Sequence, residues 1–153
     1  MAIELTNESR HLVDEARLIE IARAAMVAMH IDPDAELSIA IVDDEAMEKL
    51  HLEWMDLPGP TDVLSFPMDE LTPGTPDTPP VMGMLGDIVI APEFATAQAM
   101  EAGRQPQAEL DLLMVHGVLH LLGFDHEEPD EHKVMFDLQS EILAAFESKG
   151  SNQ

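Results

Sequence analysis

The chain contains no cysteine among its 153 residues, and it has no apolar run long enough to cross a membrane. Without cysteine there are no disulfides and no thiolate metal ligands, so a reducing compartment would not harm this protein. The first residues also lack the basic region and apolar stretch of a signal peptide. We therefore expect a soluble, cytoplasmic protein without a membrane partner.

Basic residues are scarce in this chain. Seven lysines and arginines stand against 31 aspartates and glutamates, which gives a formal net charge of −24 at pH 7. Such a surface repels polyphosphate over a Debye length of about 8 Å at physiological salt, and the basic residues form no stripe. We therefore expect no DNA partner and only weak binding of naked RNA, with the acidity serving solubility.

The pattern of apolar residues predicts short strands that alternate with helices. A chain of 153 residues buries about two thirds of its unfolded surface, so we expect residues 1–153 to form a single domain. Strands are expected at 3–5, 37–42, 63–66 and 88–91, and helices at 16–30, 43–54, 92–103, 106–122 and 129–146. Five of the eleven prolines fall within 67–80, which predicts a long surface loop, either a lid or a plain linker.

The strongest functional signal is a group of three histidines within eleven residues. His116, His120 and His126 follow the spacing HxxxHxxGxxH. On a helix the first two lie on one face with Cβ atoms about 6 Å apart, which suits two imidazoles that converge on one ion. Gly123 can adopt the left-handed conformation that ends a helix, so that His126 faces back. These three histidines are our predicted ligands of one metal ion, with a fourth position left to water.

Each histidine taken alone could instead be an ordinary hydrogen-bonded core residue. Chance would give this spacing in roughly one in a thousand chains of this composition. The surrounding helix is apolar on nearly every side, and an unpartnered buried imidazole costs roughly 1–3 kcal/mol, which one metal would remove for both rings. Gly117 supports the metal, because glycine inside a helix costs about 1 kcal/mol relative to alanine and indicates close approach of another group.

The histidine spacing is metzincin-like, but one residue of that pattern differs. Metzincin peptidases have HExxHxxGxxH, where the glutamate acts as general base. Gly117 occupies that position here, so the carboxylate of the peptidase mechanism is missing. With PTDVLSFP at 60–67, LGDIVI at 85–90 and HGVLHLLGFDH at 116–126, the chain resembles the bacterial YbeY endoribonucleases.

The resemblance implies an α+β fold in which a small mixed sheet of about four strands packs with about five helices, the metal lying near strand 63–66. It also implies a zinc-dependent endoribonuclease that cleaves single-stranded ribosomal RNA in ribosome biogenesis, with ribosomal RNA and the ribosome or assembly factors as partners. One zinc ion on three neutral imidazoles lowers the pKa of bound water to about 7, so hydroxide is available to attack a phosphodiester. Imidazole donors alone do not settle the identity of the metal.

Further residues around the motifs could have either a functional or a structural role. Asp125 and Glu127 flank the third histidine and could orient an imidazole, or they could be ordinary surface carboxylates. Asp62 and Ser65 could bind substrate, or they could be a turn cap and a plain strand residue. Many family members carry an arginine where this chain has Met55, which removes a bidentate contact to phosphate.

The remaining polar residues are expected to have structural roles. Asp87 is expected in a turn before a strand. His11, His30, His51 and His132 are expected at the surface or in packing. Two other functions stay open: a zinc peptidase or other small-substrate hydrolase, against which the glycine in the motif argues, and a non-catalytic ribosome-assembly factor whose metal is structural.

Overall fold

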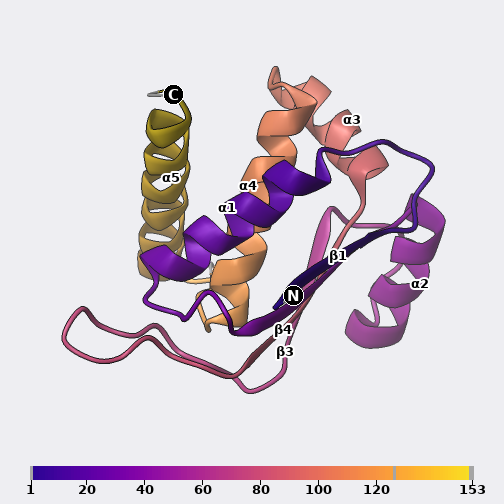
Figure 1. The fold of residues 1–153 in the computed structure, drawn as a ribbon. Helices are drawn as coiled ribbons and strands as arrows, with labels where there is room; N and C mark the ends of the chain where they lie inside the picture. The colour runs from indigo at the N-terminus through magenta and orange to yellow at the C-terminus, as the bar shows by residue number, and fades with distance from the viewer. Residues whose placement is uncertain (1, 126, 152–153) are drawn as a thin grey trace.

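A four-stranded mixed sheet forms the centre of the protein, whose computed structural model describes residues 2–125 and 127–151, the last three as backbone only. The strands are β1 (Ile3–Asn7), β2 (Glu36–Ile41), β4 (Met84–Ile90) and β3 (Val63–Pro67), in that spatial order (Figure 1). β1, β2 and β4 run parallel, and β3 pairs antiparallel with β4 at one edge. The described residues also form five helices, so the expected α+β fold is confirmed.

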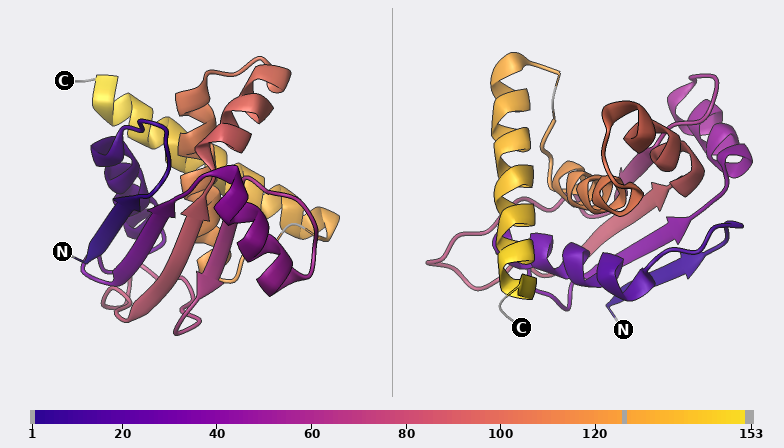
Figure 2. Two further views of the ribbon diagram at one scale, coloured as in Figure 1. Left: turned by 90° about the vertical axis from the view of Figure 1, so that its right-hand side faces the viewer. Right: turned by 90° about the horizontal axis from the view of Figure 1, so that it is seen from above.

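A layer of helices covers one face of the sheet (Figure 2). It consists of α1 (Glu15–Ala28), α3 (Pro92–Ala102), α4 (Pro106–Leu121) and α5 (Pro129–Ser151). α4 is central, because it contacts the other three helices as well as β3 and β4. Leucines, isoleucines and valines from this layer and the inner sheet face form the main core. The all-round apolar character of the predicted metal helix follows from this central position.

A smaller cluster lies on the opposite sheet face, where α2 (Asp44–Met55) packs. Val89 and Leu64 belong to it, since successive strand side chains alternate between faces. Met47 of α2 is fully buried there, but Trp54 is 62% exposed and meets Phe66 edge to face, with ring centroids 5.9 Å apart. α2 therefore covers only part of this face.

Two ion pairs with buried carboxylates hold α4 in place. Asp111, 3% exposed, receives Arg17 of α1 through Nε at 3.2 Å and Nη2 at 2.7 Å. This hydrogen bond raises the pKa of Arg17 above its ordinary value. Glu109, 1% exposed, receives Arg104 from the preceding turn at 2.9 Å. Because a buried carboxylate is tolerated only when it is paired, these contacts fix α4 against its surroundings.

The start of β4 differs from the prediction. The strand begins at Met84 rather than at residue 88, so Asp87 lies inside the strand, opposite Ser38 and Phe66, and its predicted turn position is wrong. Glycine misleads here, since Gly86 suggests a loop. It lies inside the strand at φ +140°, a conformation that L side chains rarely adopt, and a Cβ at this position would collide with the carbonyl oxygen of Phe66. The backbone conformation and the close strand approach, not a turn, account for the glycine.

The proline-rich segment 68–83 projects from the sheet as a long loop between β3 and β4 (Figure 1). Its contacts run to the turn after α1: Gly74 N donates to Met29 O at 3.0 Å, and Asp32 N donates to Val81 O at 2.8 Å. The expected surface loop is confirmed, and its action as a lid stays a prediction. In the part of the chain that is described, no helix combines the length and apolar character needed to cross a bilayer.

Candidate functional site

Helix α4 places His116 and His120 side by side. The two rings meet edge to face, with centroids 4.5 Å apart and planes at 77°. Both side chains are half-buried, and both line a cavity of about 640 Å³. The structure thus brings together two of the three predicted ligands at one hollow, next to the strand that the resemblance indicated.

The cavity walls come from β3, from the turn before it and from the end of α2. Its lining residues are Met55, Thr61, Asp62, Val63, Leu64, Ser65, Pro67, His116 and His120. Among these, only Asp62 carries a formal charge when the histidines are neutral, and none is a lysine or arginine. The hollow is therefore walled mainly by uncharged groups, with hydroxyls at Thr61 and Ser65.

Both residues proposed for substrate binding from the sequence line this cavity, and both also have structural contacts. Asp62 accepts the backbone N–H of Val63 at 2.7 Å on one oxygen and the side-chain amide of Gln98 at 3.0 Å on the other. Ser65 Oγ donates to the carbonyl oxygen of Gly117 at 3.3 Å, which ties β3 to α4. These contacts hold the carboxylate of Asp62 at the cavity wall, and its choice between a turn cap and a substrate-binding group stays a prediction.

Gly117 lets α4 come close to the sheet. A Cβ at this position would stand 3.1 Å from two side-chain atoms of Ile88 in β4, tighter than an ordinary contact. The expected close approach of another group is confirmed, but the group is a side chain of the sheet, so this glycine does not support the predicted metal. Position 117 therefore faces the sheet rather than the cavity that the two histidines line.

A residue that sequence reasoning missed orients the first histidine. Gln139, from α5, is 1% exposed, and its Oε1 lies 2.6 Å from His116 Nδ1. An amide oxygen only accepts, so this contact favours the tautomer of a neutral His116 that carries its proton on Nδ1. Such a contact fixes the tautomer of a metal-binding imidazole. The one signal in the sequence was a glutamine on the apolar face of the last helix.

The turn after α4 has the geometry expected from Gly123. This glycine has φ +94°, its N–H donates to His120 O at 3.0 Å, and Phe124 N–H donates to Leu119 O at 3.1 Å. These two bonds are those of a Schellman cap, which ends the helix and turns the chain. His126, the third predicted ligand, lies outside the described residues. Glu127 is exposed and Asp125 half-buried, and their role as orienting groups stays a prediction.

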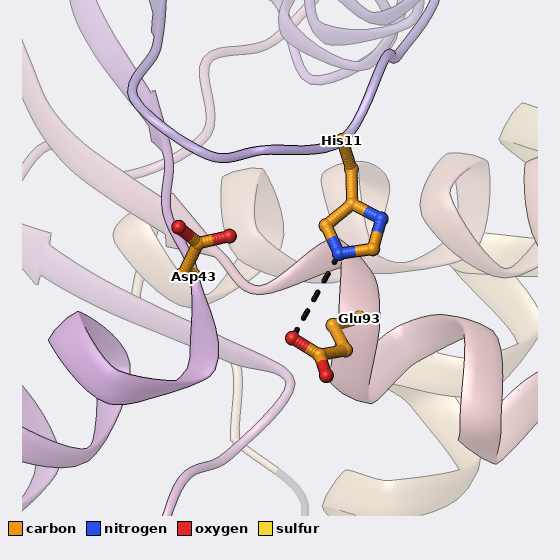
Figure 3. Close-up of side chains that lie close together, drawn as sticks. All are labelled: His11, Asp43 and Glu93. Carbon is orange, nitrogen blue, oxygen red and sulfur yellow. Dashed lines mark ion pairs between the residues drawn. The ribbon is translucent and has the colours of Figure 1, made fainter.

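The other histidines divide into two kinds. His51 Nδ1 lies 2.9 Å from Gly59 O, and His132 stacks on Phe136 with ring centroids 4.1 Å apart, both in packing roles as expected. His11 does more than the sequence suggested. Its ring joins Asp43 and Glu93 in a group whose ligand atoms all lie within 4.8 Å of one another and could hold a metal ion (Figure 3). Only the fold reveals this group, since its members come from three distant segments.

The carboxylates near His11 have perturbed acidities. Arg10 donates its backbone N–H to Asp43 at 3.0 Å and its Nε at 3.2 Å, and these bonds hold the pKa of Asp43 below its ordinary value. The next residue behaves oppositely: burial, and then the charge of Glu93, raise the pKa of Asp44. Within the described part of the chain, Asp44 Oδ1 is buried without a hydrogen-bond partner. Burial thus favours the neutral form of Asp44, whereas the contacts with Arg10 favour the ionised form of Asp43.

Comparison with known proteins gives one consistent family. Residues 4–147 match the family model described as Endoribonuclease YbeY. A relative of that description from Clavibacter sepedonicus is 57% identical over 146 residues, 95% of each chain, and one from Arthrobacter sp. (strain FB24) is 58% identical over 149 residues, 97% of this chain and 95% of the relative.

A solved structure agrees. The solution structure of TM1509 from Thermotoga maritima is similar with a TM-score of 0.60 and 26% sequence identity, covering 99% of this chain and 95% of that one. The sheet order, the histidine-bearing α4 and the match along nearly the whole sequence lead to one conclusion. The chain belongs to the YbeY endoribonuclease family.

Proposed function

We propose that this chain is a zinc-dependent, single-strand endoribonuclease of ribosomal RNA maturation, acting in the cytoplasm with ribosomal RNA and the ribosome or assembly factors as partners. Residues 1–153 would form one hydrolase domain, and His116, His120 and His126 would hold one zinc ion. The observation that carries the proposal is the pair of adjacent imidazoles on α4 at the wall of a cavity. Membership of a family named for endoribonuclease activity also supports the proposal.

The donor set fits such an ion. Gln139 accepts from His116 Nδ1, which leaves Nε2 of that ring able to bind a metal. The second ring follows one helical turn later at the same cavity. Three neutral imidazoles with an open fourth position are a common catalytic zinc set, and the ion then supplies a Lewis acid that lowers the pKa of a coordinated water to about 7.

The lining residues suggest how the chain would receive an RNA strand. Thr61 and Ser65 offer hydroxyls that can donate to phosphate oxygens. Asp62, fixed by two N–H donors, offers carboxylate oxygens that can accept from a ribose 2′-hydroxyl, the group that distinguishes RNA from DNA. A hollow of about 640 Å³ is of the size that takes one small ligand, so an unpaired nucleotide fits better than a double helix.

The peptidase alternative finds no support in this site. The general base of that mechanism stands after the first histidine, and here the residue is Gly117, which packs against Ile88 of the sheet. Asp62 is the only carboxylate that lines the cavity within the described residues. We therefore favour a phosphodiester over a peptide as substrate.

Charge limits how the protein would meet RNA. Met55 lines the cavity where many family members have arginine, no lining residue is a lysine or arginine, and the net charge is −24. Long-range electrostatics therefore oppose the approach of a free strand. We infer that the isolated protein binds naked RNA weakly and that a ribosomal or assembly partner presents the strand.

A nuclease assay with a matched histidine control tests this proposal. Zinc-loaded protein should cleave a single-stranded ribosomal RNA fragment, and H116A should lose at least about 100-fold in rate, because it removes a ligand. The control is H30N: this residue sits at φ +58°, which asparagine tolerates, and does not line the cavity, so cleavage should persist.

Two results would disprove the proposed enzymatic function. The first is wild-type cleavage by a folded H116A protein. The second is equal support of ribosome assembly by a folded variant that binds no metal, which would favour the assembly-factor alternative. Metal analysis of the same preparations reports whether zinc is the ion bound.

A further inference from the structure

We propose that His11, Asp43 and Glu93 bind a second divalent ion of the zinc class, separate from the cavity on α4. One nitrogen of His11 and one oxygen from each carboxylate lie within 4.8 Å of one another, and His11 Nε2 is 3.7 Å from a Glu93 oxygen. Ligand atoms around a tetrahedral zinc ion stand about 3.4 Å apart. Small side-chain movements would therefore close the group around an ion (Figure 3).

The sheet brings the three ligands to one place. His11 follows β1, Asp43 precedes α2 at the end of β2, and Glu93 lies in the first turn of α3 after β4. These strands are parallel, so their carboxyl ends share one edge, where open α/β sheets bind ligands. The ligands therefore come from three segments that each follow a strand of the sheet, rather than from one loop.

The strand pairing even continues beyond the strands. Glu8 N–H donates to Ile41 O at 2.7 Å, and Val42 N–H donates to Ile90 O at 3.0 Å. These two bonds join the segments that lead to the three ligands. The relative positions of the three backbones are thus set by hydrogen bonds before any ion arrives.

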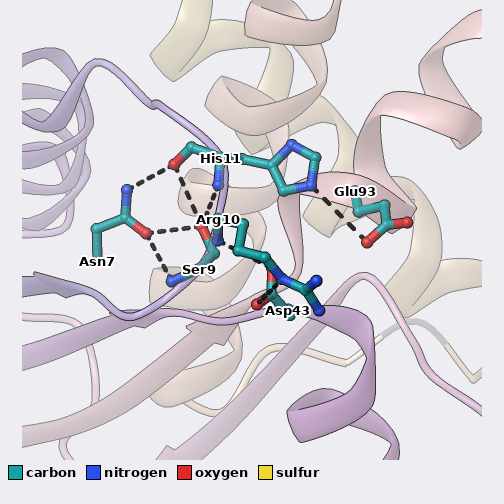
Figure 4. A network of polar contacts seen from close by, with 6 residues as sticks. All are labelled: Asn7, Ser9, Arg10, His11, Asp43 and Glu93. Carbon is teal, nitrogen blue, oxygen red and sulfur yellow. Dashed lines mark hydrogen bonds and ion pairs between the residues drawn. The ribbon is translucent and has the colours of Figure 1, made fainter.

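The loop that carries His11 is ordered by its own polar residues (Figure 4). Asn7 donates its side-chain amide to His11 O at 2.8 Å, and Ser9 Oγ donates to Asn7 Oδ1 at 2.7 Å. Arg10 holds Asp43 through the two bonds described above. A preorganised ligand set loses less conformational entropy on binding, which favours affinity.

A further carboxylate stands beside this group. Asp44, next to Asp43, has a carboxylate oxygen with less than 1 Å² exposed and no hydrogen-bond partner among the described residues. A buried acceptor left without a donor costs roughly 1–3 kcal/mol. Burial raises the pKa of Asp44, and a divalent ion at the neighbouring group would lower the cost of ionising it. The histidine indicates which ion. Calcium and magnesium select oxygen ligands, whereas imidazole with carboxylates suits zinc and its transition-metal neighbours.

The experiment uses the full chain with the α4 site removed by the double substitution H116A/H120A. Zinc is titrated by calorimetry, and cobalt by its visible absorption, with circular dichroism to verify folding. One equivalent should still bind. Adding E93Q, or H11Q, should weaken that binding by at least roughly tenfold, because each removes a ligand. E101Q is the matched control: it makes the same change on the same helix, at another exposed glutamate, and should leave binding unchanged.

The outcomes are distinguishable from those for the proposed nuclease. Loss of all binding in the H116A/H120A background, or equal affinity for E93Q and E101Q, overturns the second site whatever the fate of RNA cleavage. If the double variant does not fold, the stoichiometry of the otherwise intact chain decides: two zinc equivalents should fall to one with E93Q and stay at two with E101Q. A single equivalent in all three proteins would contradict the inference.

Discussion

The two candidate ion sites differ in their support and in their charge. On α4, two imidazoles stand on one buried helix, at a cavity whose lining holds a single carboxylate. At the carboxyl ends of β1, β2 and β4, one imidazole meets two carboxylates, with a third one beside them. The first arrangement leaves an ion its full positive charge for polarising water, and the second largely neutralises it. By this difference the first site suits catalysis and the second suits structural stabilisation.

The largest expected effect comes from releasing the helix that supports the first site. Arg17→Met leaves the buried Asp111 without its cation, with Gln107 still donating to one oxygen, which should destabilise the fold by about 3 kcal/mol in urea unfolding. Arg23→Met, on the same helix, is the control, because Arg23 takes part in no ion pair found among the described residues. The affinity of the α4 site for its ion should fall together with stability, whereas the affinity of the second site should fall less. Equal stability of the two variants would disprove the assigned role of this ion pair.

A narrower substitution separates orientation from ligation. Gln139→Leu removes the acceptor of His116 Nδ1 while keeping a buried side chain of similar size. Zinc affinity at the α4 site should fall by roughly 10- to 100-fold, the usual cost of losing a group that orients a metal-binding imidazole. Calorimetry measures it, with the exposed neighbour Ser140→Ala as control. Unchanged affinity would mean that the ring needs no such support.

The smallest expected effect sharpens the difference in charge. Met55→Arg places a guanidinium at the cavity. The affinity of this variant for single-stranded RNA should rise about fivefold at 0.15 M salt, because the guanidinium can make a charge-assisted contact to phosphate. Leu52→Arg adds the same charge on the same helix at an exposed site outside the cavity lining. Fluorescence anisotropy compares the two. Equal gains would show that net charge alone, rather than a contact in the cavity, governs binding.

The histidine pair was predictable because its geometry is local. Spacing of four residues on a helix fixes the relation of His116 to His120, and the cap at Gly123 depends only on its immediate neighbours. Gln139 was not predictable, since its position depends on how α5 packs on α4. The group around His11 required the order of the parallel strands, which the periodicity of a strand does not contain.

The same reasoning explains the error at β4. Glycine has low strand propensity, and only pairing with neighbours on both sides draws residues 84–87 into the sheet. The overall fold class was within reach because it depends on the count and alternation of elements, and because the family resemblance supplied the mixed sheet. Boundaries and contacts between distant segments were determined by tertiary structure.

Helix α3 gives the arrangement a mechanical consequence. Glu93 lies in its first turn, and Gln98, little more than one turn further along, donates the amide that holds Asp62 at the cavity wall. Because a helix moves as a rigid unit, a rotation of α3 that draws Glu93 toward an ion also displaces the side-chain amide of Gln98 that bonds Asp62. Occupancy at the first turn of α3 would thereby be transmitted through Gln98 to the cavity wall at Asp62, without a change in the sheet between them.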